Sequence, residues 1–399
     1  MIFGFTALQC YVAIVAIFCV VYLFTSRKNI WFPFVVITVL FSLLAYNLTP
    51  APTDDLVIYY HHIDIFRNDG IDGVCYALEQ NWFEWKTYRV SLLYFYFISR
   101  LPNNQFLPAI TIFIVYGLMF TVLYKAANRF KIKKIYLFFA SMFLISTYWY
   151  YDVASGVRNG IAFTVAFACA YYHFVEKKHI FWCFVGYVCV CLMHPTGFMP
   201  VLLVLITMLT WKINSKIINI ILIFGLALGG YLIDFLAEIT NNDMIMSIAG
   251  RTEQHSAGGS LETGTMFLVN VATFAVVAFI VLYTSFYINN GKFSEQFRKF
   301  YKYTTLTLCF LVGCLFSGLI FVRFTRWIIP MIGALYFMIG MQSQREVIQK
   351  LPVGYLNEAP FRETIRLRTR GIVIIAYIAY TAVHFWYSLA GSSLQWLYF

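Results

Sequence analysis

Twelve long apolar runs recur along this chain, and they constrain its fold more than any other feature. A helix needs about 20 apolar residues to cross a hydrocarbon core about 30 Å thick. Only 12% of the residues are charged, whereas soluble domains carry roughly 25%. We therefore predict an all-α integral membrane protein, with residues 1–399 forming a single polytopic domain of about twelve transmembrane helices. The predicted spans are 2–24, 30–48, 106–124, 135–151, 157–175, 180–193, 197–211, 217–239, 266–288, 304–322, 327–341 and 371–390.

Two stretches depart from the pattern of full-length spans. Residues 81–100 are aromatic and amphipathic, and a span there would disturb the alternation of charge along the chain. We predict an amphipathic helix in the outer membrane interface, where Trp and Tyr rings are favoured. The runs 180–193 and 197–211 are short and are joined by His194-Pro195-Thr196. They predict a re-entrant hairpin whose tip lies below the outer surface and lines a cavity, because irregular backbone at that depth needs polar partners.

Charged residues divide unequally between the two sets of loops that alternating spans produce. One set, which includes the loop at 342–370, holds 21 of the 29 Lys and Arg residues but only five of the 18 Asp and Glu residues. Because cytoplasmic loops are enriched in Lys and Arg, we predict that this set is cytoplasmic. The opposite set faces outward and contains both termini, the loop at 49–105 with its interfacial helix, and the loop at 240–265.

The sequence lacks the motifs of common soluble enzymes. There is no Walker loop, GxGxxG, HExxH or GxSxG motif, which argues against an ATPase, a dehydrogenase or a zinc protease. The net charge of +11 follows the bilayer orientation and does not indicate nucleic-acid binding. Nothing in the sequence requires a metal, a nucleotide or another cofactor.

Three arginines lie at the outer ends of predicted spans: Arg158, Arg323 and Arg326. They could anchor helices at the interface, because long basic side chains reach toward lipid headgroups. We favour an inward-facing cationic pocket, since the outer side is otherwise acidic. Arg323 and Arg326 sit at a predicted turn between two spans and would share a face if a helix continued through them. Guanidinium groups bind phosphate or pyrophosphate in a bidentate manner.

Gly156 and Gly160 flank Arg158 and form a GxxxG pair. The ordinary role of such a pair is close helix packing. Close packing could also hold Arg158 in a fixed direction, so the two interpretations are compatible.

His194 is the next candidate for a functional residue. A lone histidine in an apolar hairpin is often a structural residue with satisfied hydrogen bonds. Its place at a proline-broken tip and a reference pKa of about 6.5 would instead suit a base near neutral pH. Thr196 beside it could cap the following helix.

The first outer loop begins with a dense mixture of acids and histidines. Asp54 and Asp55 stand close to His61 and His62 in the sequence. A metal site is one interpretation, although the ligands have no recognised spacing, and a solvated loop is another. A third is a carboxylate that orients a sugar hydroxyl or acts as a base. Weaker candidates for that role are Asp152 and Glu84.

Several of these residues lie in motifs that resemble those of a known family. The run Ser155-Gly156-Val157-Arg158-Asn159-Gly160-Ile161-Ala162 is similar to Gly-Ile-Arg-Gln-x-Ile-Ala, with Asn159 in place of the usual Gln. Asp55 and Tyr59 match Asp-x-x-x-Tyr after the second span. Lys177, Lys178 and Phe181 precede His194-Pro195-Thr196, which looks like His-x-Ser/Thr. Arg323 and Arg326 stand before an aromatic residue, where Trp327 replaces the expected Tyr. Between about residues 54 and 330, the chain resembles the EpsG-like, Wzy-type polysaccharide polymerases.

This resemblance implies an enzyme of the bacterial inner membrane with both termini in the periplasm. It would transfer a growing glycan from polyprenyl pyrophosphate onto an incoming lipid-linked repeat unit, as in the synthesis of O-antigen, capsule or exopolysaccharide. The implied partners are the polyprenyl-pyrophosphate-linked oligosaccharide, membrane lipid, and a chain-length regulator and flippase of the same pathway.

The resemblance and the residue chemistry together predict a site. The predicted catalytic residues are Arg158, His194 and Asp55. The predicted substrate-binding residues are Arg323, Arg326, Tyr59, Asp54, Asn159, Thr196 and Arg89. Arginines would stabilise the departing pyrophosphate, since a preorganised donor contributes about 3–4 kcal/mol. His194 or an outer-loop carboxylate would activate the acceptor hydroxyl.

Three rival functions stay open. A C-type glycosyltransferase would use a polyprenyl-monophosphate sugar donor, with Asp54 or Asp55 as its base. A flippase or transporter would move the same lipid-linked sugar, although transporters often have repeated halves and no repeat is visible in this sequence. An envelope acyltransferase would also use an outward-facing histidine.

Overall fold

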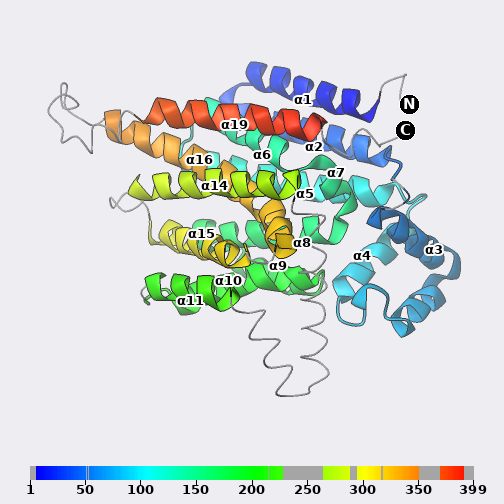
Figure 1. The fold of residues 1–399 in the computed structure, drawn as a ribbon. Helices are drawn as coiled ribbons and strands as arrows, with labels where there is room; N and C mark the ends of the chain where they lie inside the picture. Colours follow the sequence, from blue (N-terminus) through cyan, green and yellow to red (C-terminus); the bar gives the residue numbers. More distant parts are fainter. Residues whose placement is uncertain are drawn as a thin grey trace.

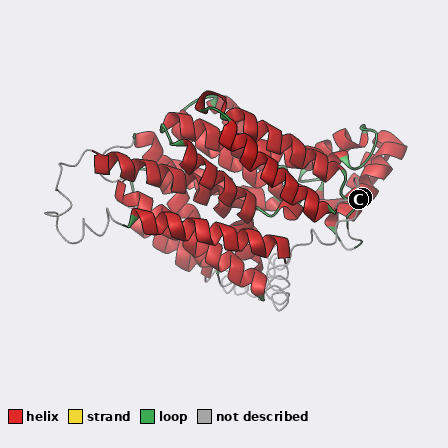
Figure 2. Ribbon diagram, turned by 90° about the horizontal axis from the view of Figure 1, so that it is seen from above, coloured by secondary structure: helices red, strands yellow, loops and turns green. Residues whose placement is uncertain are grey.

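A computed structural model of the protein describes residues 6–50, 52, 54–213, 215–227, 264–287, 294–315, 318–349 and 369–390. Every regular element in this part of the chain is a helix, and the long helices lie side by side with roughly parallel axes (Figure 1). The view from above shows the same side-by-side arrangement (Figure 2). The main helices of the first half are α1 (Ala7–Phe24), α2 (Trp31–Tyr46), α3 (Asp55–Glu79), α4 (Arg89–Ser99), α5 (Phe106–Arg129), α6 (Lys134–Thr147), α7 (Tyr150–Ser155) and α8 (Val157–Tyr171). Those of the second half are α9 (Ile180–Cys191), α10 (Phe198–Leu209), α11 (Ser215–Ala227), α14 (Thr265–Tyr287), α15 (Glu295–Cys314), α16 (Gly318–Gln349) and α19 (Arg370–Ala390).

Five of these helices are long and apolar enough to cross a membrane: α1, α5, α14, α16 and α19. Shorter apolar helices include α2, α4, α6, α9 and α10. The helical, membrane-type architecture is therefore confirmed, while the number of twelve spans stays a prediction. The apolar stretch of α16 is 94% buried and that of α19 only 22%, so α16 occupies the centre of the bundle and α19 its surface.

The long helices extend between two ends of the bundle (Figure 1). At one end, the hydroxyl of Tyr22 donates to the backbone oxygen of Lys134 at 2.8 Å. At the same end, Arg129 forms an ion pair with Glu176 at 3.6 Å. We call the end that contains Lys134 and Glu176 the lysine end.

Helices α3 and α4 lie at the opposite end of the bundle (Figure 1). There the backbone N–H of Val90, at the start of α4, donates to the backbone oxygen of Leu192 at 3.1 Å. We call this end, which contains Arg158 and His194, the arginine end. The described loops of the two sets, such as those at Lys134 and at Val90, therefore lie at opposite ends, and the side of the membrane that each end faces stays a prediction.

The first outer loop is largely helical. Helix α3 begins after Asp54 and continues to Glu79, with a kink at Gly70, where φ is +62°. Its buried residues Leu56, Tyr59 and Ile63 recur at helical spacing, and this face of α3 packs against α4, where Tyr59 meets Phe95. Residues 81–100 contain α4, whose buried residues follow the same spacing. Its position at a membrane interface stays a prediction.

The boundary between the two spans predicted at 304–322 and 327–341 differs from the prediction. Helix α15 ends at Cys314, and α16 begins at Gly318 and continues through Arg323 and Arg326. The predicted turn at these arginines is therefore wrong. Arginine is a good helix former, and the apolar residues around these two arginines are buried within one helical pattern, so charge alone does not end the helix. Most of the loops predicted at 240–265 and 342–370 lies outside the described residues.

Candidate functional site

Arg158 lies in the first turn of α8, and its side chain is buried at the arginine end, with the residue only 6% exposed. Its Nε donates to the backbone oxygen of Met193, and Nη2 donates to that of Phe83, both at 3.4 Å. The guanidinium carbon also lies 5.6 Å from the ring centres of Phe83 and Tyr88. These contacts connect α8 with the hairpin and with the segment before α4, so Arg158 joins three parts of the chain that are distant in sequence.

The close approach of α16 to α8 depends on the two glycines. A Cβ at Gly156 would lie 2.8 Å from the indole of Trp327 and 2.6 Å from the backbone oxygen of Asp152. A Cβ at Gly160 would lie 3.3 Å from the same indole. The prediction that the GxxxG pair provides close packing is confirmed, and this packing supports the helix start that carries Arg158.

Tyr59 reaches Arg158 from α3. Its residue is 6% exposed, and its ring packs against Phe83 at 5.2 Å and Phe95 at 4.9 Å. Its hydroxyl interacts with the guanidinium of Arg158. Burial raises the pKa of Tyr59 to about 12 despite this cation, so the hydroxyl stays protonated. Asp55, one turn earlier, is exposed, and its charge also acts on Tyr59.

His194 follows α9 and precedes a short 3-10 turn at Pro195–Gly197. The backbone N–H of Thr196 donates to Nδ1 of His194 at 3.3 Å. The hydroxyl of Thr196 lies 2.7 Å from the same nitrogen and donates to Oδ1 of Asn159 at 2.8 Å. Asn159 and Thr196 therefore hold the imidazole in place through its Nδ1.

Two arginines act on the charge of His194. Burial, followed by the charges of Arg158 and Arg323, lowers the pKa of His194 from 6.5 to about 3. The ring is therefore neutral at physiological pH. With so low a pKa, His194 is a poor base near neutral pH.

Arg323 and Arg326 do not share one role. Arg323 is exposed, and no carboxylate of the described residues forms an ion pair with it. Arg326 instead pairs with Asp152 at 2.8 Å and lies 5.3 Å from the ring centre of Trp149. The carboxylate of Asp152 therefore already compensates the charge of Arg326, and the convergence of all three arginines on one site stays a prediction.

The structure shows other contacts for the remaining sequence candidates. Arg89 is exposed, and its Nε donates to the backbone oxygen of Lys86 at 2.9 Å. Asp54 is the residue before the first turn of α3. His62 is buried, with its ring 4.4 Å from that of Trp82. In the described part of the chain, no three His, Cys, Asp or Glu residues are placed to hold a metal ion.

Two contacts of Arg158 were missed in the sequence. Phe83 and Tyr88 lie in the aromatic segment for which an interfacial helix was predicted. Because aromatic residues are frequent along the whole chain, these two did not stand out as candidates. Glu84, a weak candidate in the sequence, lies close enough for its charge to act on Arg158. A search for aromatic residues near a predicted interface could have selected this segment, although not its partner.

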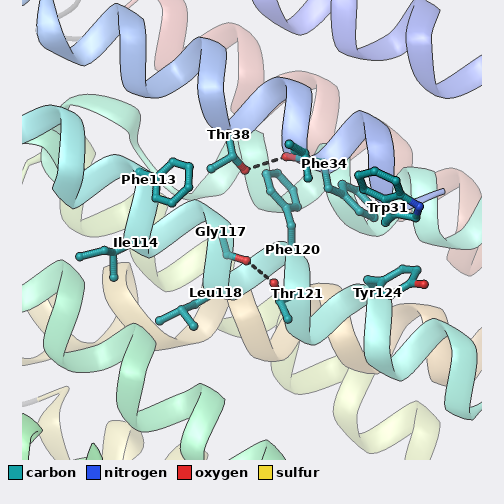
Figure 3. Close-up of a pocket in the computed structure, with 11 residues that line it drawn as sticks. Trp31, Phe34, Thr38, Phe113, Ile114, Gly117, Leu118, Phe120, Thr121 and Tyr124 are labelled. Atoms are coloured by element: carbon teal, nitrogen blue, oxygen red, sulfur yellow. Dashed lines mark hydrogen bonds between the residues drawn. The ribbon is translucent and has the colours of Figure 1, made fainter. Parts of the chain in front are cut away.

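One prominent pocket lies away from this cluster. It is a groove of about 470 Å³ between α2 and α5, with Trp31 and Tyr124 at one end and Phe113 at the other (Figure 3). Between these ends, Gly117 leaves room beside Thr38 (Figure 3). The cavity that the hairpin predicted would lie at His194, which is not among the lining residues of this groove.

Comparison with known proteins gives no further assignment. No protein-family model, no curated protein and no solved structure matches this chain.

Proposed function

We propose that the chain is a polysaccharide polymerase that transfers a growing glycan from polyprenyl pyrophosphate to an incoming lipid-linked repeat unit at the arginine end. The observation that carries this proposal is the electrostatic cluster of Arg158, His194 and Arg323 at one end of a membrane-type bundle. Its residues come from the motifs on which the resemblance to Wzy-type polymerases rests.

The two cations suit a pyrophosphate for different reasons. Arg158 is buried and held by backbone oxygens, which preorganises its guanidinium. Arg323 is exposed and carries a charge that acts on the same imidazole, so an anion could approach both. Because bidentate guanidinium contacts favour phosphate oxygens, a lipid diphosphate matches this arrangement.

In the proposed reaction, the acceptor hydroxyl oxygen bonds to the anomeric carbon of the growing chain as the bond from that carbon to the pyrophosphate oxygen breaks. The leaving pyrophosphate takes the electron pair and gains negative charge. Arg158 and Arg323 would stabilise that charge. Pyrophosphate departs without protonation, so the reaction needs no general acid.

The acceptor proton must move to a base. His194, with its pKa lowered to about 3, is too weak a base for this step, which leaves a carboxylate. Asp55 acts on Tyr59 and Glu84 acts on Arg158, so either carboxylate lies in the electrostatic neighbourhood of the cluster. Asn159 and Thr196 then serve as positioning residues for His194.

The decisive experiment combines purified protein with lipid-linked repeat units and no nucleotide, and measures product length. Wild type is expected to produce a ladder of glycans, and Arg158→Ala only the starting unit. Arg100→Ala is a matched control, because Arg100 also donates to a backbone oxygen, that of Phe66, at the same end. An Arg158→Ala protein that folds and still produces the ladder contradicts the proposal.

Related measurements distinguish the polymerase from two of the other functions. A C-type glycosyltransferase would require a monophosphate sugar donor and lose activity in Asp55→Asn, whereas Arg158→Ala would only weaken binding. The exposed position of Asp55, close enough for its charge to act on Tyr59, favours this second candidate. A flippase would move labelled lipid across vesicles without changing glycan length.

A further inference from the structure

A second cavity lies at the lysine end, far from the cluster around Arg158. It has a volume of about 540 Å³ and is formed where the ends of α8 and α10 meet the start of α15. Three lysines line it: Lys177, Lys212 and Lys299. None of its described lining residues is acidic, so the cavity is strongly cationic.

Local structure determines where these lysines lie. Lys177 ends the π-helical turn Tyr172–Glu176 and adopts a left-handed backbone conformation with φ of +52°. Lys212 follows the end of α10 and is exposed. Lys299 lies in the second turn of α15, with its Nζ 5.2 Å from the ring centre of Trp211. Three separate chain segments therefore present ammonium groups to one cavity.

One carboxylate partly compensates the positive charge of the cavity. Glu295 forms an ion pair with Lys299 at 3.0 Å, but its side chain is 54% exposed, and it is not among the lining residues of the cavity. An exposed pair of this kind is weak and readily exchanged for a stronger anion. The charge of Lys177 also acts on Glu295, so this one carboxylate faces two lysines, and Lys212 adds a third positive charge to the cavity.

Apolar residues continue from the cavity onto the outside of the bundle. Ile180, Met208 and Leu209 line it and are 44%, 41% and 81% exposed. Phe181 and Trp182 extend this exposed apolar surface along α9, at 70% and 66%. A ligand with an anionic head and apolar chains would match both parts, whereas a small inorganic anion would use only the lysines.

The position of the cavity along the helix axes agrees with binding of a lipid headgroup. Arg158 and Lys177 lie 19 positions apart on one mostly helical segment, which corresponds to about 28 Å at the α-helical rise. This length is close to the hydrocarbon thickness of a bilayer, about 30 Å. If the arginine end lies at one interface, the lysine cavity lies at the other, at the level of lipid headgroups.

We propose that this cavity binds an anionic phospholipid, with its headgroup phosphate among Lys177, Lys212 and Lys299 and its acyl chains along α9 and α10. Basic pockets at one membrane face are a known mode of anionic-lipid recognition. The site is independent of the proposed polymerase reaction, since no residue is shared between the two.

The test is native mass spectrometry of the purified full-length protein with phosphatidylglycerol or phosphatidylcholine. Wild type is expected to retain phosphatidylglycerol selectively. Each lysine near an anionic lipid contributes roughly fivefold in affinity, so the triple variant Lys177→Gln, Lys212→Gln and Lys299→Gln should bind on the order of a hundredfold more weakly. The single variant Lys212→Gln, at an exposed position, provides a measurement that does not depend on how the triple variant folds.

The matched control removes the same charge from the same end, through Lys28→Gln, Lys125→Gln and Lys131→Gln, all at exposed positions. It should bind phosphatidylglycerol as wild type does. Equal loss in both triple variants would show a diffuse surface effect and overturn the proposal, as would equal retention of phosphatidylcholine by wild type. Displacement of the lipid by an equal concentration of inorganic phosphate would also overturn it, because an anion site without chain recognition would then suffice.

Discussion

The two ends of the bundle carry positive charge in different physical forms. At the arginine end, Arg158 is buried, and its hydrogen bonds go to backbone oxygens. At the lysine end, Lys177 and Lys212 are exposed around an open cavity. A buried cation is costly unless polar partners or a ligand compensate it, whereas exposed lysines cost little. The difference therefore indicates one preorganised site and one site that sums several weak attractions.

The largest effect is expected from Arg158. Arg158→Gln should reduce polymer formation by about a hundredfold or more, because removal of one preorganised donor has that effect on a transition state of developing charge. Lys212→Gln, which removes a charge from the other end, should change polymer formation by less than about twofold. Product sizing of both purified variants checks the comparison. Similar losses in the two variants would remove the distinction between the ends.

The next effect concerns the packing that supports Arg158. Gly156→Ala should destabilise the protein by about 1–3 kcal/mol, since the added Cβ overlaps Trp327 and the backbone of Asp152. Gly160→Ala should have a smaller effect, because its Cβ would come no closer than 3.3 Å to Trp327 and 3.5 Å to Val115. Thermal unfolding in detergent measures both variants. A lower melting temperature for Gly160→Ala than for Gly156→Ala would contradict this packing.

Ion pairs give a third test of the same contrast. The side chains of Arg326 and Asp152 are 20% and 17% exposed. Asp152→Asn should therefore lower stability by about 1–3 kcal/mol, as expected when a partly buried cation loses its partner. At the lysine end, Glu295→Gln should give no measurable change in melting temperature, because that pair is exposed to solvent. Equal changes in stability for the two variants would mean that the two ion pairs do not differ in strength because of burial.

The pH dependence of stability should reveal His194. Its pKa is lowered to about 3 in the folded protein, against an ordinary value of 6.5. Between these values the unfolded chain binds a proton that the folded chain does not, so the contribution of His194 is present above pH 6.5 and declines as the pH falls toward 3. Melting temperatures measured from pH 7 to pH 4 should decrease less steeply in His194→Gln than in wild type. An unchanged slope would show that the imidazole is not held neutral by burial and the two arginines.

Much of the candidate site was present in the sequence as separate motifs. Arg158, Asn159, His194 and Thr196 were selected because polar residues are rare inside apolar runs. The contacts that link Asn159 through Thr196 to His194 were not predicted from the sequence. A hydrogen bond between α8 and the turn after α9 depends on how the two helices are placed. The pairing of Arg326 with Asp152 was missed for the same reason.

The sequence by itself determined that the chain forms apolar helices and that its charge divides between two sets of loops. Hydrophobicity and charge are properties of each segment, so they need no knowledge of neighbours. Only the tertiary structure decided that Arg158 is buried, that Arg323 remains exposed and that Arg326 is neutralised. Three identical side chains differ in this way because the cost and the partners of a charge depend on what packs around it.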